Sequence, residues 1–412
     1  MIEYNTFTLS NGLRVVHNYD GATAMVALNV MYDVGARDEL PEMTGMAHLF
    51  EHLMFGGSVN VPDFDGAIEN AGGMNNAWTS NDYTNFYDIV PAQNVETAFW
   101  VESDRMLSLA FNEKALDVQR HVVIEEFKQT CLNRPYGDMS HYLRALIYKQ
   151  HPYRFPVIGK EISHIEKVTQ DDVKEFFYGH YVPNNAVLAV SGNISFDKVC
   201  RLAEKWFGAI PRREISPRNY LPEPQQEESR FEEVMGNVPQ TALVKAFRMP
   251  AYGAPDYVEC DIITDLLASG RSSRFYRNLL MNTGLFTEID ASIIGSDEPG
   301  FLMLNSKLIE NTQSAIESAS DAIMKEVQRL IDGDVTDYEL TKTINRFESN
   351  FMFSSMGFLA KAQSLANYMM HNEDVNELVS KYRNVTVDDI ARVAKDIFDL
   401  EKCSTLVYRP QK

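Results

Sequence analysis

A proline-rich, charged stretch in the middle of the chain is the feature that most constrains its fold. Between about Pro211 and Arg230, four prolines lie among Arg, Glu and Gln residues, a composition typical of an extended linker. The chain has 412 residues, which exceeds the size at which a single hydrophobic core stops growing. We therefore expect two domains, at residues 1–210 and 231–412, joined by a linker at residues 211–230.

The segments on either side of this linker show the same order of strand and helix signals. Before it, the signals for strand, helix and strand fall at Val26–Tyr32, Thr44–Phe55 and Tyr83–Val90. After it, signals for a strand, a helix and two strands fall at Thr241–Phe247, Tyr257–Ala268, Phe286–Ile294 and Phe301–Lys307. The repeated order predicts a duplicated α+β fold with two homologous halves.

Charge and cysteine content exclude several classes of protein. The formal net charge is -20, which disfavours nucleic acid and anionic membrane surfaces, because both bind basic proteins. The four cysteines are far apart and form no C-x-x-C pair, so they predict neither a cysteine zinc site nor a redox dithiol. Solubility explains the excess of acidic residues, and so does an acidic chamber that attracts basic peptides.

The sequence shows no targeting or membrane-spanning pattern. No run of apolar residues approaches the ~18 that cross a bilayer, and the first residues carry neither a basic nor an apolar leader pattern. We therefore expect a cytoplasmic protein that has neither nucleic acid nor a membrane as its partner.

One short segment, His48-Leu49-Phe50-Glu51-His52, carries residues suited to metal chemistry. Histidines at positions i and i+4 of a helix share one face, about 6 Å apart, so two imidazoles can bind one cation. Glu51 lies beside that face, where its carboxylate can act on water at the metal. The surrounding residues are strongly apolar, and burying these polar groups without partners would cost several kcal/mol. A zinc ion would remove that cost.

A catalytic zinc site needs a third protein ligand and one open position. The helix expected at Glu113–Thr130 offers Glu125 and Glu126, whose directions differ by about 100°. The apolar face of this helix favours Glu126 only slightly, so the spacing alone leaves both acids open.

Further segments extend these motifs into a resemblance that covers nearly the whole chain. They include Ser10–Leu13, Gly35–Glu39, Thr44–Gly57, Asn75–Thr79, Asp82–Thr84, Val122–Glu126, His151–Tyr153, Gly192-Asn193 and Gly270–Arg274. The chain resembles the zinc peptidases with an inverted H-x-x-E-H motif, typified by pitrilysin, insulin-degrading enzyme and the mitochondrial processing peptidase β subunit. Its length is similar to that of the short, processing-peptidase-like branch.

The resemblance implies a fold, an activity and a set of site residues. It implies two halves, each a mainly antiparallel sheet packed with helices, that form a clamshell around a chamber. It implies one Zn²⁺ per chain, held by His48, His52 and Glu126, with Glu51 as the general base of an endopeptidase. It also implies that Asn76 and Ala77, on an edge strand, bind the main chain of an extended peptide substrate.

Two positions depart from the family pattern. Gln119 stands where the family usually has a second glutamate that supports the metal ligands from outside, and an amide brings no negative charge there. Active members also carry an Arg and a Tyr around a Gly-Leu step in the second half, where they hold the substrate. Around Gly284-Leu285 this chain has Leu280 and Thr287 instead.

The missing Arg/Tyr clamp predicts a division of labour between two chains. We expect this chain to be the metal-bearing subunit of a heterodimer, in which a homologous sister subunit supplies the clamp. Tyr276 and Arg277 lie nearby, but their positions are typical of ordinary helix residues. The alternatives are a self-sufficient homodimeric peptidase and a non-catalytic scaffold subunit of the same fold.

Overall fold

The computed structural model describes residues 1–411 and divides them into two compact units. The first unit consists of Met1–Phe127, Phe155–Tyr220 and Phe351–Glu377. The second unit consists of Lys128–Arg154, Leu221–Asn350 and Leu378–Lys412. One boundary between the units therefore lies inside the expected linker, but each unit also contains a segment from the other half of the chain.

The first unit is built on a six-stranded sheet with the order β1-β2-β6-β3-β5-β4. Its strands are β1 Asn5–Thr8, β2 Arg14–Tyr19, β3 Met25–Tyr32, β4 Met74–Thr79, β5 Thr84–Pro91 and β6 Ala186–Gly192. The pair β2–β6 is parallel and all other neighbours are antiparallel. This order leaves β4 at one edge of the sheet.

Helices pack on this sheet, and the hydrophobic core of the unit lies between them and the strands. They are α1 Met46–Leu53, α2 Phe64–Asn70, α3 Val95–Leu107, α4 Glu113–Phe127, α6 Ile162–Glu166, α7 Gln170–His180, α8 Phe196–Phe207 and α12 Phe358–Met370. Alternate residues of β3, from Val26 to Tyr32, point into a core that they share with apolar residues of α1, α3, α7 and α8. The strand predicted at Val26–Tyr32 is therefore confirmed, and its alternate side chains share one face of the sheet.

The second unit repeats the arrangement with a five-stranded sheet, β7-β11-β8-β10-β9. Its strands are β7 Arg230–Gly236, β8 Ala242–Arg248, β9 Phe286–Ile294, β10 Phe301–Leu308 and β11 Ser404–Pro410. The pair β7–β11 is parallel and the other neighbours are antiparallel. The strands β2-β6-β3-β5-β4 of the first sheet show the same order of parallel and antiparallel pairs. The predicted α+β fold with two homologous halves is confirmed.

The helices of the second unit include one that begins and ends where the sequence predicts it, at Tyr257–Ala268. These helices include α9 Tyr257–Ala268, α10 Gln313–Ile331, α11 Asp337–Ser354, α13 Leu378–Arg383 and α14 Val387–Ile397. The apolar faces of α9, α10 and α14 pack into one core with β8 and β10. Thr312 caps α10 by accepting a hydrogen bond from the Ala315 N–H.

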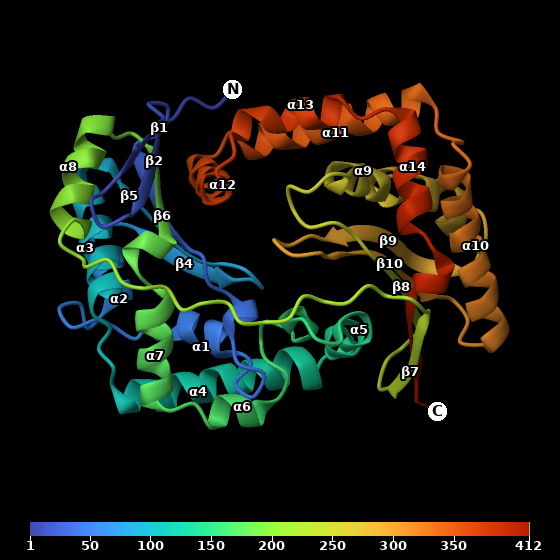
Figure 1. Cartoon of the computed structure of the whole chain (residues 1–412), viewed down its shortest axis with the longest axis horizontal. Coiled ribbons are helices and arrows are strands. Elements are labelled where there is room, and N and C mark those ends of the chain that lie inside the picture. The colour runs from blue at the N-terminus through green and yellow to red at the C-terminus, as the bar shows by residue number, and fades with distance from the viewer. Residues whose placement is uncertain (412) are drawn as a thin grey trace. The chain divides into compact units, whose positions relative to one another are not determined.

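Each half of the chain contributes one helix to the sheet of the other half. Helix α12, from the second half, packs on β6, β3 and β2 of the first sheet, as Figure 1 shows by its red colour beside blue and green strands. Helix α5 (Met139–Ile147), from the first half, packs on β11 and β7 of the second sheet. The compact units therefore do not follow the chain, and the ranges 1–210 and 231–412 stay a proposal about the repeated halves.

The expected linker has no helix or strand from Pro211 to Ser229, and β7 begins at Arg230. Two of its side chains nevertheless fix its path. Arg218 pairs with Asp33 and Asp38 of the first unit, at 2.7 and 2.8 Å. Glu223 accepts hydrogen bonds from three consecutive backbone N–H groups, those of residues 149–151, at 2.8–3.0 Å in the second unit. Across residues 1–411, no helix combines the length and the apolar character that crossing a bilayer requires.

Candidate metal centre

Helix α1 carries the H-x-x-E-H segment, and its first turn is held from outside the helix. Gly45 stands at the N-cap with φ 89°, a left-handed conformation that favours glycine, and has no side chain to cap the helix. Instead, the buried carboxylate of Glu39 accepts hydrogen bonds from the N–H groups of Gly45 and Ala47, both at 2.8 Å. Glu39 therefore supplies the cap that Gly45 lacks, and its second bond fixes the backbone at Ala47, directly before His48.

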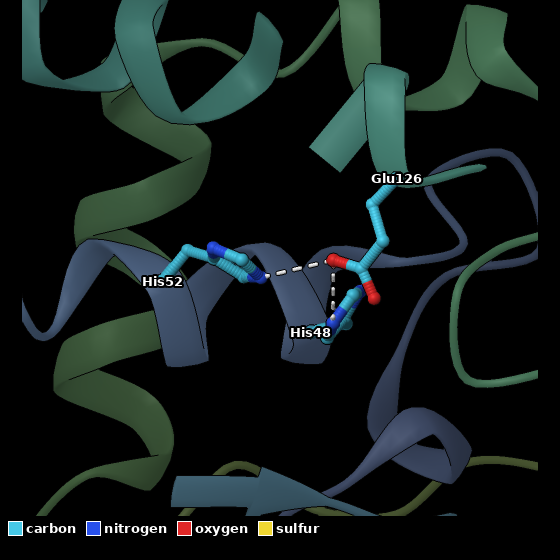
Figure 2. A group of neighbouring side chains, drawn as sticks. All are labelled: His48, His52 and Glu126. Atoms are coloured by element: carbon cyan, nitrogen blue, oxygen red, sulfur yellow. Dashed lines mark ion pairs between the residues drawn. The ribbon is translucent and has the colours of Figure 1, made fainter. Parts of the chain in front are cut away.

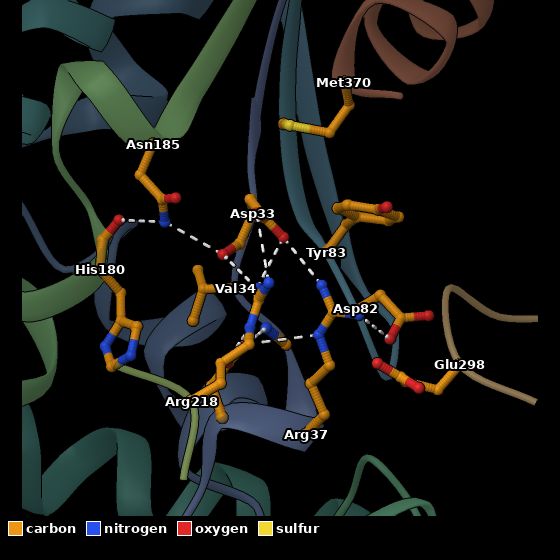
Figure 3. Close-up of polar contacts among 12 residues, drawn as sticks. Asp33, Val34, Arg37, Asp82, Tyr83, His180, Asn185, Arg218, Glu298 and Met370 are labelled. Carbon is orange, nitrogen blue, oxygen red and sulfur yellow. Dashed lines mark hydrogen bonds and ion pairs between the residues drawn. The ribbon is translucent and has the colours of Figure 1, made fainter. Parts of the chain in front are cut away.

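The loop that presents Glu39 is fixed by a cluster of ion pairs, drawn in Figure 3. Arg37 is almost fully buried and pairs with Asp33 and Asp82, each at 2.9 Å. Asp82 belongs to the turn between β4 and β5, so this guanidinium joins the loop before α1 to the end of β4. The linker residue Arg218 pairs with Asp33 and Asp38 in the same cluster.

Two histidines of α1 and one glutamate of α4 meet at a single point, as Figure 2 shows. The Oε2 atom of Glu126 lies 3.4 Å from Nε2 of His52 and 3.7 Å from Nε2 of His48. The two imidazole rings are 4.9 Å apart and stand nearly perpendicular, at 84°. Within residues 1–411, this is the one group of His, Cys, Asp or Glu side chains with metal-binding spacing.

The structure separates the two acids that the sequence left open. Leu116, Val123 and Phe127 are buried, as expected, so α4 turns this face to the core. Glu126 lies at the border of that face and reaches the histidines, whereas Glu125 is exposed. Glu126 is therefore the acid that joins the cluster.

The protonation states of the cluster suit a cation. Burial lowers the pKa of His48, and His52 lowers it further, although the Glu126 carboxylate opposes them. A hydrogen bond from His52 lowers the pKa of Glu126, so that acid is ionised at neutral pH. A neutral imidazole and a carboxylate both offer electron pairs to a metal.

The three donors fit a zinc ion. Zinc takes imidazole nitrogen and carboxylate oxygen ligands at about 2.0–2.2 Å, so tetrahedral neighbours stand roughly 3.3–3.5 Å apart. The separations of 3.4 and 3.7 Å from Glu126 are close to that value. His48 Nδ1 is buried, and no protein group within residues 1–411 forms a hydrogen bond with it.

Glu51 lies on α1 between the two histidines in sequence and is half-buried. Its Oε2 atom accepts a hydrogen bond from the Thr79 hydroxyl at 2.6 Å. Burial raises the pKa of the Glu51 carboxyl, while this hydrogen bond and His52 lower it. The Thr79 contact was not predicted from the sequence, because no spacing rule relates a strand residue to a helix residue 28 positions earlier.

Asn76 and Ala77 lie on β4, the edge strand of the first sheet. Asn76 is exposed and Ala77 is half-buried, and the Asn76 side chain accepts a hydrogen bond from the Ala77 N–H at 2.8 Å. Within residues 1–411, no strand pairs with the free side of β4. An extended peptide could add there.

The remaining predicted positions are Gln119 in the first unit and the clamp positions in the second unit. Gln119 is half-buried on α4, two turns before Glu126, and its amide has no hydrogen-bond partner within the described residues. In the second unit, Leu280 is half-buried and Thr287 is exposed on β9, while Arg277 is exposed and Tyr276 half-buried in a π-helical turn at Phe275–Leu280. Neither position of the expected clamp therefore offers an Arg or a Tyr.

The duplicated α+β fold and the His-His-Glu cluster are typical of a class of metalloproteins, and comparison with family models identifies the family. The model described as "Insulinase (Peptidase family M16)" matches residues 14–159, and "Peptidase M16 inactive domain" matches residues 167–347. The chain belongs to peptidase family M16, which confirms the expected resemblance.

Two relatives and one solved structure match nearly all of the chain. A protein named zinc protease PqqE from Helicobacter pylori is 27% identical and covers 99% of this chain and 93% of its own length. The mitochondrial-processing peptidase subunit beta of Saccharomyces cerevisiae is 24% identical over 93% of this chain and 86% of its own. A crystal structure of a protease from Helicobacter pylori superposes with a TM-score of 0.93 at 26% identity and covers 100% of both chains.

Proposed function

We propose that this chain is a zinc-dependent endopeptidase that hydrolyses extended peptides, and that it is the metal-bearing subunit of a heterodimer. The observation that carries the proposal is the meeting of His48, His52 and Glu126 at one point, with the Glu51 carboxylate on the same helix. The names of the relatives support it, because several are called zinc proteases.

His48, His52 and Glu126 would hold one zinc ion, a ligand set that leaves a fourth position open for water or substrate. When bound, the ion supplies Lewis-acid chemistry, which makes water a stronger acid and polarises a carbonyl oxygen. The neutral state that burial favours for His48 keeps its electron pair available for this ligand role.

Glu51 acts as the general base and then as the general acid. Its carboxylate takes a proton from the attacking water and delivers it to the amine that leaves when the peptide bond breaks. The raised pKa that burial gives this carboxyl suits both steps, because the group must bind a proton and release it in one cycle.

The edge strand β4 supplies the binding surface for the substrate. A peptide that adds to β4 at Asn76 and Ala77 would join the sheet as a further strand through the outward-facing backbone of Ala77, so the substrate must be extended. Unfolded peptides and short precursors are therefore better substrates than folded proteins.

A sister subunit supplies what this chain lacks. Leu280 and Thr287 replace the Arg and Tyr that hold the substrate in active members, so the proposed partner carries that clamp. The similarity to a peptidase subunit named beta supports a heterodimer. A self-sufficient homodimer would be active alone, and a non-catalytic scaffold, which the missing clamp favours, would be inactive with every partner.

Cleavage of an unstructured peptide by the zinc-loaded chain, alone and with a homologous sister, tests the proposal. We expect cleavage only with the sister, and a loss of at least about 100-fold in kcat for Glu51→Gln, since proton transfer by a positioned base contributes 10²–10⁴-fold. Glu125→Gln, which removes a neighbouring exposed acid, is the matched control and should cleave like the wild type. Full activity of the chain alone would replace the heterodimer with the homodimer, and cleavage by Glu51→Gln at the wild-type rate would refute the base.

A further inference from the structure

A single hydrogen bond joins the side chains of helix α1 to those of strand β4. Thr79 Oγ1 donates to Glu51 Oε2 at 2.6 Å, and within residues 1–411 no other side-chain hydrogen bond or ion pair connects these two elements. Hydrogen bonds from a hydroxyl to a carboxylate are short and about twice as strong as neutral ones. Because Thr79 and Glu51 are both half-buried, solvent screens this bond only in part.

Thr79 belongs to the part of β4 whose backbone faces the free edge. Ser80 N–H bonds to the Tyr83 carbonyl, so position 80 faces β5 and the positions that alternate with it face outward. The Ala77 N–H agrees with this, because it bonds to the Asn76 side chain and not to β5. A peptide that adds to β4 would therefore pair with the backbone of Ala77 and Thr79, while the Thr79 side chain reaches Glu51.

The hydrogen bond from Thr79 makes the two carboxylate oxygens of Glu51 different from each other. Oε2 of Glu51 is occupied, and Oε1 has no hydrogen-bond partner within the described residues. A glutamate side chain has three rotatable bonds, so one fixed oxygen restricts the direction of the other. An alcohol is a far weaker acid than a carboxyl group, so the threonine proton stays on Oγ1, and Oε1 is the oxygen left to take a proton from water.

We propose that Thr79 is the positioning residue for Glu51, and that it links occupation of the edge strand by a peptide to the orientation of the base. This inference rests on the proposed peptidase function. A peptide paired with Ala77 and Thr79 stiffens the strand that carries the hydroxyl, so the base is oriented most firmly when substrate is bound. The residue does not touch the reacting atoms and acts only through Glu51.

Steady-state kinetics with Thr79→Val and Thr79→Ser tests this role in the zinc-loaded chain with its sister subunit. The valine is nearly isosteric and removes the hydroxyl, so we expect kcat to fall about 10-fold or more, the effect of one charge-assisted hydrogen bond, with KM changed less than about twofold and zinc content unchanged. Thr79→Ser should restore kcat to within about threefold of the wild type. Thr8→Val, on the exposed edge strand β1 at the opposite side of the same sheet, is the matched control.

A double-mutant cycle with Glu51→Leu measures the same contact without catalysis. In metal-free protein, Thr79→Val should shift the unfolding equilibrium constant about tenfold when Glu51 is present, and this shift should vanish in the Glu51→Leu background. Equal shifts in both backgrounds, or wild-type kcat in Thr79→Val, would overturn the positioning role. If the wild-type chain cleaves nothing with zinc and a sister, the peptidase proposal fails, and the cycle still reports separately on the Thr79 contact.

Discussion

The buried carboxylate that caps the first turn of α1 offers a quantitative test of how the site is held. Glu39 is 8% exposed and is the acceptor for the N–H groups of Gly45 and Ala47, both buried. A buried donor that loses its acceptor costs about 1–3 kcal/mol. Glu39→Leu leaves both donors without an acceptor and should lower the free energy of unfolding by about 2–6 kcal/mol, whereas Glu39→Gln retains one acceptor and should cost about 1–3 kcal/mol.

The same carboxyl makes the cost depend on pH. Burial raises the pKa of Glu39 from 4.5 to about 8, although the two N–H donors lower it. The unfolded chain binds fewer protons than the folded one between these values, so the contribution of Glu39 is complete below pH 4.5 and is lost as the pH rises to about 8. At about 1.36 kcal/mol per pH unit, this interval corresponds to about 5 kcal/mol.

Urea unfolding of metal-free protein between pH 5 and pH 8 measures both effects. The wild type should be more stable than Glu39→Gln at pH 5, and the difference should shrink and then reverse toward pH 8, because glutamine does not titrate. Glu42→Gln, an exposed acid three residues away, is the control and should change the free energy of unfolding little at any pH. A difference that grows with rising pH would refute the reasoning, since it would mean that the N–H donors hold the carboxylate ionised.

Two further predictions concern the framework of the first unit. Arg105 is 1% exposed, forms a hydrogen bond with the buried Glu102 and lies over the rings of Phe64 and Phe86. Arg105→Met removes one partner of a buried ion pair, so it should lower the free energy of unfolding in urea by about 3–5 kcal/mol. A change below about 1 kcal/mol would contradict this reasoning. Arg218→Ala removes a partly exposed pair with Asp33 and takes one partner from the buried Asp38 carboxylate, so it should lower the free energy of unfolding by about 1–3 kcal/mol and speed proteolysis between Pro211 and Ser229. An unchanged cleavage rate would show that Arg218 does not restrain that segment.

Local sequence patterns predicted most of the helices and strands. They did not predict that each half of the chain places a helix on the sheet of the other half. The ranges Tyr257–Ala268 and Phe286–Ile294 agree with α9 and β9 at both ends, because strong apolar periodicity is bounded there by glycine or polar turn residues. The placement of α5 and α12 on the sheet of the opposite half could not be predicted. The apolar face of each helix predicts that this face is buried, but the helical periodicity does not specify which sheet buries it.

The candidate site was predictable to the extent that one helix contains it. The spacing of His48 and His52 specifies a shared face, and the structure brings both side chains to Glu126. The choice between Glu125 and Glu126 needed the packing of α4, since both acids lie near the border of its apolar face. The contacts of Glu39 and Thr79 join different elements, and such pairs have no signature in the periodicity of either partner.

The proposed function depends on one zinc ion that two imidazoles and one carboxylate bind together. The anomalous difference map of crystals grown with zinc, recorded at the zinc absorption edge, tests it most directly. We expect one peak per chain, about 2.0–2.2 Å from Nε2 of His48, Nε2 of His52 and Oε2 of Glu126. Zinc bound elsewhere, or no peak between these three side chains, would contradict it.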